Sequence, residues 1–126
     1  MLTENTYQFS EVMDKANQFT TFPLVIAAQP KHEMEMLLAH LTPNTPWGER
    51  QIAAKKLGYI RDPEALPDLL AALPTDPFWM VRCAIIQALE MIGDVKAVPT
   101  LREVAKRDGF QVVRSYAAKA IERLSQ

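Results

Sequence analysis

Histidines and carboxylates gather in one short segment, and these residue types are common metal ligands. His32 and His40 are the only histidines of the chain, with Glu33 and Glu35 between them and Glu64 further along. A helix would carry the two histidines on similar faces, but about two turns apart. The segment has neither the HExxH nor the CxxC spacing of zinc sites, and no second His-Glu pair follows later in the chain. We therefore expect no metal and no cofactor.

Other catalytic signals are also weak. The single cysteine, Cys83, cannot form an internal disulfide, and its apolar helical position is typical of a small buried residue in a reducing cytoplasm. The chain has only four glycines, without a glycine-rich phosphate loop or a nucleophile elbow. These patterns predict no catalytic residues and favour a protein that is not an enzyme.

The composition of the chain fits one soluble domain over residues 1–126. Its 126 residues are 48% hydrophobic, which is enough to bury one continuous core. A net charge of −1 argues against a general nucleic-acid binder. The first residues carry acids and no basic residue, unlike a signal peptide, and the longest apolar run, Leu24 to Ala28, is far shorter than the ~20 residues of a membrane span. We expect a cytoplasmic protein that binds neither nucleic acid nor membrane.

Three arginines, Arg50, Arg82 and Arg114, follow one another at intervals of 32 residues and reveal an internal repeat. We call them the register arginines. Other sets aligned by the same interval are Ala54, Ile86 and Ala118; Leu57, Leu89 and Ile121; Asp62 and Asp94; Pro67 and Pro99; and Asp76 and Asp108. Repeats of this length are typical of solenoids built from stacked helical hairpins. Trp47 and Trp79 also lie one repeat apart, and they should cover the ends of neighbouring helices rather than stack a ligand.

Apolar residues recur at helical spacing in every segment, so the expected fold is all-α. The predicted helices cover residues 4–19, 30–41, 47–61, 63–73, 78–92, 95–107 and 110–124, and the helical context also favours a helix for the ambiguous run 22–28. The residues of helix 47–61 that should face the core are Ile52, Ala53, Leu57 and Ile60. Residues 1–42 are expected to form a diverged N-terminal capping repeat, and residues 46–126 regular repeats that end in a C-terminal half repeat.

The register arginines fall near the starts of helices, where the helix dipole disfavours a cation. Carboxylates must therefore compensate them. Asp62 and Asp94 in the turns within repeats, or Asp76 and Asp108 between repeats, are placed to accept two parallel hydrogen bonds from a guanidinium. Either set predicts a structural ladder along the stack rather than an anion-binding site.

Residues 76–84 have the sequence Asp-Pro-Phe-Trp-Met-Val-Arg-Cys-Ala and are followed by Ile92-Gly93-Asp94 and Ala97-Val98-Pro99. This pattern resembles the short HEAT-like repeat of phycobilin lyases and of many bacterial and archaeal proteins. The similarity covers residues 46–126 well and residues 30–42 weakly. It implies a right-handed α-α superhelix of about three to three and a half helical hairpins, with the second helices of the hairpins along the concave side.

Two functions from different classes fit such a fold. The first is a non-catalytic protein-protein interaction module or adaptor, whose partner the sequence does not identify. The second, which the resemblance implies, is a phycobilin-lyase-like or phycobilisome-associated protein that handles a bilin or its carrier subunit. A nucleic-acid reader would need a basic concave channel, whereas the outward residues of the second helices are mixed to acidic. A protein partner is therefore expected.

Candidate partner-binding residues lie on two surfaces. The second helices present Glu64, Asp68, Lys96, Thr100 and Glu103, and the last helix presents Tyr116, Lys119 and Arg123. Residues 1–48 carry a net charge of −3, from two lysines and five carboxylates, and residues 95–126 carry +4, from seven basic and three acidic residues. A basic last helix suits an acidic partner or a second copy of the chain.

The last helix has no second helix after it in the predicted repeat. Some of Val112, Tyr116, Ala120 and Leu124 should therefore be less buried than their equivalents one repeat earlier. An apolar surface with basic residues around it predicts docking of a partner, or end-to-end homodimerisation, through this helix.

Overall fold

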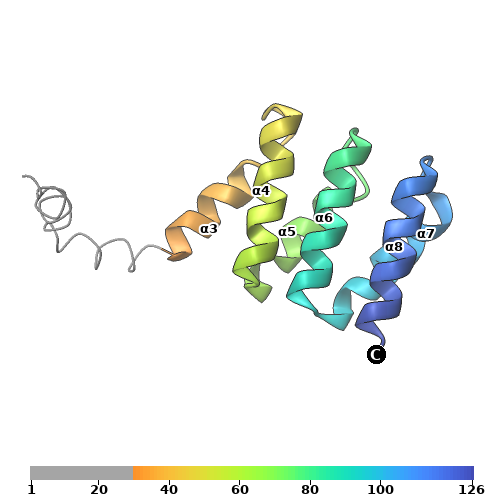
Figure 1. Ribbon diagram of the computed structural model, residues 1–126. Coiled ribbons are helices and arrows are strands. Elements are labelled where there is room, and N and C mark those ends of the chain that lie inside the picture. Colours follow the sequence, from red (N-terminus) through yellow and green to blue (C-terminus); the bar gives the residue numbers. More distant parts are fainter. Residues whose placement is uncertain (1–29) are drawn as a thin grey trace, which may run out of the picture. The chain divides into compact units, whose positions relative to one another are not determined.

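The computed structural model describes residues 30–126, and this part of the chain consists of helices and turns without a strand. A boundary between Glu33 and Met34 divides the chain into two units. The α-helices are α3 (Pro30–Ala39), α4 (Trp47–Ile60), α5 (Leu66–Ala72), α6 (Trp79–Ile92), α7 (Val98–Arg107) and α8 (Gln111–Leu124), and the short 3-10 helices η1 (Pro63–Ala65) and η2 (Val95–Ala97) precede α5 and α7 (Figure 1). The predicted all-α solenoid is confirmed.

Two predicted segments, residues 4–19 and 22–28, lie outside the described residues. The same holds for most of the predicted capping repeat, residues 1–42. Of that repeat, α3 is described, and it buries Met34 and Leu37. The division of the chain into one capping repeat and the regular repeats stays a prediction.

The two turns inside the regular repeats are built alike. Arg61 ends α4 and Gly93 ends α6, each in the left-handed backbone region, with φ of 58° and 77°. The next residue, Asp62 or Asp94, caps the short 3-10 helix, because its Oδ1 accepts a hydrogen bond of 2.9 Å from the backbone N–H two residues on. The carboxylates of these two aspartates therefore serve the turns rather than the arginine ladder.

The first helices of the hairpins pack side by side. Helix α4 lies against α6 and α6 against α8, while α5 packs on α6 and α7 on α8 (Figure 1). Their inward residues form one hydrophobic core, whose largest fully buried side chains are Leu57, Leu69, Leu73, Val81, Ile85, Ile86, Leu89, Leu101 and Val113. Each hairpin therefore covers its apolar face with the next one, as solenoids require.

One residue of the predicted core lies outside it. Ile52 is 53% exposed, in a surface hollow between α3 and α4, whereas Ala53 and Leu57 are buried as predicted. The side of α4 that carries Arg50 and Ala54 is buried instead, because Arg50 reaches the loop before α6. The inward stripe of α4 is thus rotated away from Ile52.

Helix α4 approaches α6 very closely at Gly58. A Cβ atom placed on Gly58 would lie 2.9 Å from the Cα of Ala88 and 3.0 Å from the sulfur of Met91, so the packing requires glycine. One repeat later Glu90 takes the place of Gly58, and its carboxylate pairs with Arg123 of α8. The backbones of α4 and α6 therefore approach each other directly at Gly58 and Ala88, whereas α6 and α8 are joined by an ion pair.

Candidate functional site

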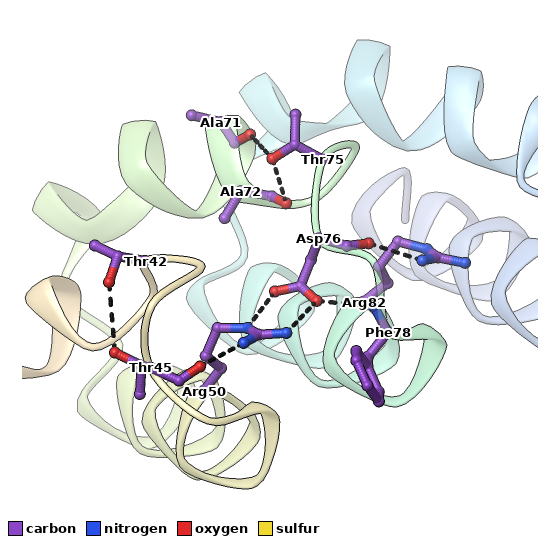
Figure 2. Close-up of polar contacts among 9 residues, drawn as sticks. All are labelled: Thr42, Thr45, Arg50, Ala71, Ala72, Thr75, Asp76, Phe78 and Arg82. Atoms are coloured by element: carbon purple, nitrogen blue, oxygen red, sulfur yellow. Dashed lines mark hydrogen bonds and ion pairs between the residues drawn. The ribbon is translucent and has the colours of Figure 1, made fainter.

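The register arginines are held by carboxylates from the loops between repeats. Arg50 donates from Nε to Oδ2 of Asp76 at 2.7 Å and from Nη2 to Oδ1 at 3.1 Å (Figure 2). Its Nη1 donates to the backbone oxygen of Thr45, and Oδ1 of Asp76 accepts from the backbone N–H of Phe78 at 3.0 Å. Both side chains of the pair are only 4% exposed. The guanidinium and the carboxylate therefore satisfy each other inside the stack.

The next rung of the ladder repeats this geometry. Arg82 donates to Asp108 from Nε at 2.7 Å and from Nη2 at 2.9 Å, and its Nη1 donates to the backbone oxygen of Asp76 at 2.8 Å. Burial alone would raise the pKa of Asp108, but hydrogen bonds from Arg82 and from the backbone N–H of Phe110, with the charges of Arg82 and Arg114, lower it. Of the two sets of aspartates predicted to hold the arginines, Asp76 and Asp108 are confirmed.

Aromatic rings run beside the ladder. Trp47 stacks on Phe78 with ring centroids 5.4 Å apart, and Trp79 stacks on Phe110 at 6.0 Å. Phe78 and Phe110 are the residues immediately before α6 and α8, so each tryptophan covers the start of the neighbouring first helix, as predicted. Each phenylalanine ring also lies 5.8 Å from the guanidinium carbon of a register arginine. Ladder and rings together fix the spacing between hairpins.

A groove follows the first helices across α4, α6 and α8. Three neighbouring hollows of about 340, 250 and 210 Å³ form it, and all three share Gln87 at its centre. We call it the first-helix groove, and its lining includes Lys55, Tyr59, Gln87, Glu90, Met91, Tyr116, Lys119 and Arg123. Three of the predicted partner-binding residues, Tyr116, Lys119 and Arg123, are thus brought together with residues of α4 and α6.

Charge in the first-helix groove is positive on balance. Glu90 pairs with Arg123, and this hydrogen bond raises the pKa of Arg123. Within residues 30–126, no carboxylate forms an ion pair with Lys55 or Lys119. Tyr59 is 72% exposed and adds a large ring at the end of α4. These groups fit an acidic segment that also carries apolar side chains.

The sequence contained a signal for the groove residues that the prediction missed. Lys55 and Gln87 precede Lys119 by two repeats and by one repeat, and Tyr59 and Met91 precede Arg123 in the same way. Two register positions of each first helix therefore line the groove. The prediction assigned binding to the second helices and, among the first helices, to α8 alone. It did not consider the residues of α4 and α6 that are equivalent to Lys119 and Arg123.

The other five predicted residues lie along the second helices. Glu64 is in η1, Asp68 in α5, Lys96 in η2, and Thr100 and Glu103 in α7. Glu103 accepts a hydrogen bond of 2.8 Å from Arg107, which lowers the pKa of Glu103, and it lines a smaller hollow beside Pro74. These residues spread mixed charge over two helices, whereas the first-helix groove gathers its residues around one centre.

Exposure on the last helix follows the prediction at two of its four positions. Val112 is exposed where Met80 is half-buried, and Tyr116 is half-buried where Ala84 is buried, whereas Ala120 is as buried as Ala88. The prediction that some of these four residues are less buried than their equivalents is therefore confirmed. Ala118 is also exposed, at the position of buried Ile86. This difference fits the packing, because α6 has α8 beside it and α8 is the last helix of the described residues.

The residues with the chemistry of metal ligands and nucleophiles are dispersed. His32 and His40 are both exposed, and no group of three or more His, Cys, Asp or Glu side chains in residues 30–126 is arranged to hold a metal ion. Burial raises the pKa of the Cys83 thiol, although the charge of Arg82 opposes this, so the thiol is a poor nucleophile. In the same part of the chain, no helix has the length and apolarity needed to cross a membrane.

Comparison with known proteins agrees with the repeat geometry. Residues 34–122 match the family described as HEAT repeats, which is more than half of the chain. The matched segment begins within α3 and ends within the last turn of α8. No curated protein and no solved structure is significantly similar to the chain.

Proposed function

Because the chain belongs to the HEAT repeat family, we propose that it is a non-catalytic protein-binding module whose first-helix groove holds an acidic segment of a partner protein. HEAT repeats generally mediate contacts between proteins. The observation that carries the proposal is the groove itself, where three helices present aromatic, apolar and basic side chains around Gln87.

The aromatic and the basic residues of the groove contribute to binding in different ways. Tyr59 and Tyr116 offer rings that bury a large area at a small cost in side-chain entropy. Lys55 and Lys119 attract carboxylates of the partner and set its direction along the helices. Because α4, α6 and α8 are locked by the ladder and the core, the groove needs little reorganisation when a partner binds.

A photo-crosslinking amino acid placed at Gln87 tests this function. The variant is expressed in its native cells and irradiated. It should form a covalent adduct with the partner protein, which mass spectrometry then identifies. The double charge reversal Lys55→Glu with Lys119→Glu should remove the adduct, because it turns the groove acidic. The matched control is Lys106→Glu, a reversal on the exposed surface of α7, which should leave the adduct in place.

The same crosslinking amino acid placed at Lys96 tests the alternative, that the partner binds the second helices. An adduct formed from Lys96 but not from Gln87 would move the binding site to the second helices, where Glu64, Asp68 and Thr100 also lie. No adduct from either position would count against a protein-binding role.

Other expectations stay predictions. Handling of a bilin or its carrier subunit, implied by the resemblance to phycobilin lyases, is tested by the absorbance spectrum of a bilin after mixing with the protein. Homodimerisation through α8 is tested by sedimentation velocity, and a cytoplasmic location by cell fractionation.

A further inference from the structure

Each of the three register arginines donates a hydrogen bond from Nη1 to a backbone oxygen of the loop before its own helix. Nη1 of Arg114 donates to the backbone oxygen of Asp108 at 2.6 Å, just as Nη1 of Arg82 donates to the oxygen of Asp76. Nη1 of Arg50 makes a similar contact with the backbone oxygen of Thr45, one residue closer along the chain. The guanidinium of Arg114 is therefore held at the start of α8 as the other two are held at the starts of α4 and α6.

Within residues 30–126, a carboxylate pairs with Arg50 and with Arg82 but not with Arg114. In both complete rungs the aspartate lies 26 residues after the arginine, in the loop before the next first helix. No hydrogen bond or ion pair joins Arg114 to a carboxylate of residues 30–126, and the carboxylate of Asp108 is already bound by Arg82. Nε and Nη2 of Arg114 therefore have no carboxylate partner among these residues, and Ala118, one turn further along α8, is exposed.

We propose that Arg114 is a recognition site for a partner segment with the sequence Asp-x-Phe, where x is any residue. Arg114 does not line the first-helix groove, so this is a second site, and the proposal rests on the protein-binding function above. The chain itself contains the template twice, as Asp76-Pro77-Phe78 and as Asp108-Gly109-Phe110. In each copy the carboxylate accepts from Nε and Nη2 of an arginine and from the phenylalanine N–H, and the ring lies beside the guanidinium.

At Arg114, the aspartate carboxylate of the partner segment should contribute more to the binding free energy than its phenylalanine ring. Gln111 stands where Trp47 and Trp79 stand in the earlier repeats, so the partner's phenylalanine loses the stacking seen at Phe78. The paired hydrogen bonds from Arg114 to a carboxylate are unaffected by this difference. Specificity for the aspartate is therefore the primary expectation.

A second copy of the chain is a poor occupant of this site. Subtracting one repeat from Asp76 and Phe78 gives Asn44 and Pro46, at the loop that precedes α4. An end-to-end contact in the same register would therefore offer Arg114 an amide and a proline, with neither the charge nor the ring. This mismatch favours a different protein as the source of the segment.

Peptide binding tests the proposal directly. The probe is a fluorescein-labelled peptide with the sequence of residues 72–80, Ala-Leu-Pro-Thr-Asp-Pro-Phe-Trp-Met, and the measurement is fluorescence anisotropy against the full chain. We expect saturable binding that weakens about tenfold or more when the peptide aspartate is replaced by asparagine, because a charged hydrogen-bond pair is lost. Equal affinity of the two peptides, or no measurable binding, would overturn the proposal.

Variants of the chain locate the site. Arg114→Ala and Arg114→Lys should both weaken binding, the second because a lysine lacks the planar fork that meets both carboxylate oxygens. Arg102→Ala removes an exposed arginine of α7 and should leave the affinity unchanged. Circular dichroism melting confirms that each variant is folded. An affinity unchanged in both Arg114 variants would place the peptide elsewhere and reject this site.

Two further outcomes separate this inference from the proposed function. Self-association of the wild-type chain that disappears in Arg114→Ala would identify a second copy as the occupant and would overturn the assignment to a different partner. Arg114→Ala could also leave both the Gln87 crosslink and the peptide affinity unchanged. That result would support the protein-binding function and would reject Arg114 as a binding site.

Discussion

Arg50 and Asp76 lie 26 residues apart in the sequence, yet they form a two-pronged ion pair whose side chains are each 4% exposed. Asp76→Ala should lower the free energy of unfolding by ~3–5 kcal/mol, because it leaves a buried guanidinium without its counter-charge. Urea denaturation followed by circular dichroism measures the change.

Two variants control this experiment. Arg50→Met with Asp76→Leu removes both charges and should cost much less than the sum of the single substitutions. Arg114→Ala breaks only one bond, to a backbone oxygen, and should cost at most about 1.5 kcal/mol. A loss for Asp76→Ala as small as that for Arg114→Ala would show that the ladder does not stabilise the stack.

The ion pair of Asp108 predicts a dependence of stability on pH. The pKa of Asp108 is lowered from its ordinary value of 3.8, so the unfolded chain binds this proton more readily than the folded one. The stabilisation from this carboxylate is therefore complete above pH 3.8 and is lost as the pH falls below it toward the folded-state pKa. In Asp108→Asn the difference in unfolding free energy from wild type should be largest at pH 7 and should narrow below pH 3.8.

A neutral core variant separates charge from general weakening. Leu101→Ala should lower the unfolding free energy by a similar amount at every pH, because it changes no titrating group. A constant gap between Asp108→Asn and wild type from pH 7 to pH 3 would mean that the Arg82–Asp108 pair does not set the acid sensitivity.

Two glycines of the same helix should respond in opposite directions to alanine. Gly58→Ala should destabilise the protein by ~1–3 kcal/mol, because the new methyl group would press on the Cα of Ala88 and on Met91. Gly48→Ala meets nothing within 4 Å and should stabilise by ~0.4–1 kcal/mol through lower entropy of the unfolded chain. Thermal unfolding of both variants checks the signs, and a stabilising Gly58→Ala would contradict the close approach of α4 and α6.

Core and surface isoleucine or leucine positions can be compared in the same way. Leu89 is fully buried, so Leu89→Ala should cost ~2–5 kcal/mol through the cavity that it leaves. Ile52 is 53% exposed, and Ile52→Ala should stay within ~0.5 kcal/mol of wild type. Unfolding free energies from urea titration give both values. Similar losses at the two positions would mean that Ile52 packs as the sequence pattern first indicated.

Much of the architecture could be predicted because the repeat places equal residues in equal environments. The interval of 32 residues between the register arginines located the hairpins, and Gly93 and Asp94 located the turn within one of them. Helical periodicity predicted α4 to α8 to within a residue or two at most ends. These features are local, since caps, turns and apolar spacing act within a few residues along the chain.

Only the tertiary structure decided which groups meet across hairpins. The sequence spacing allowed either Asp62 and Asp94 or Asp76 and Asp108 as partners of the arginines. In the structure, the packing of successive loops places Asp76 and Asp108 against the arginines. The first-helix groove depends on the same packing, because Lys55, Gln87 and Lys119 become neighbours only when α4, α6 and α8 lie side by side. A sequence period states which positions are equivalent, whereas the rotation of each helix in the stack determines which of them face a neighbour and which face solvent.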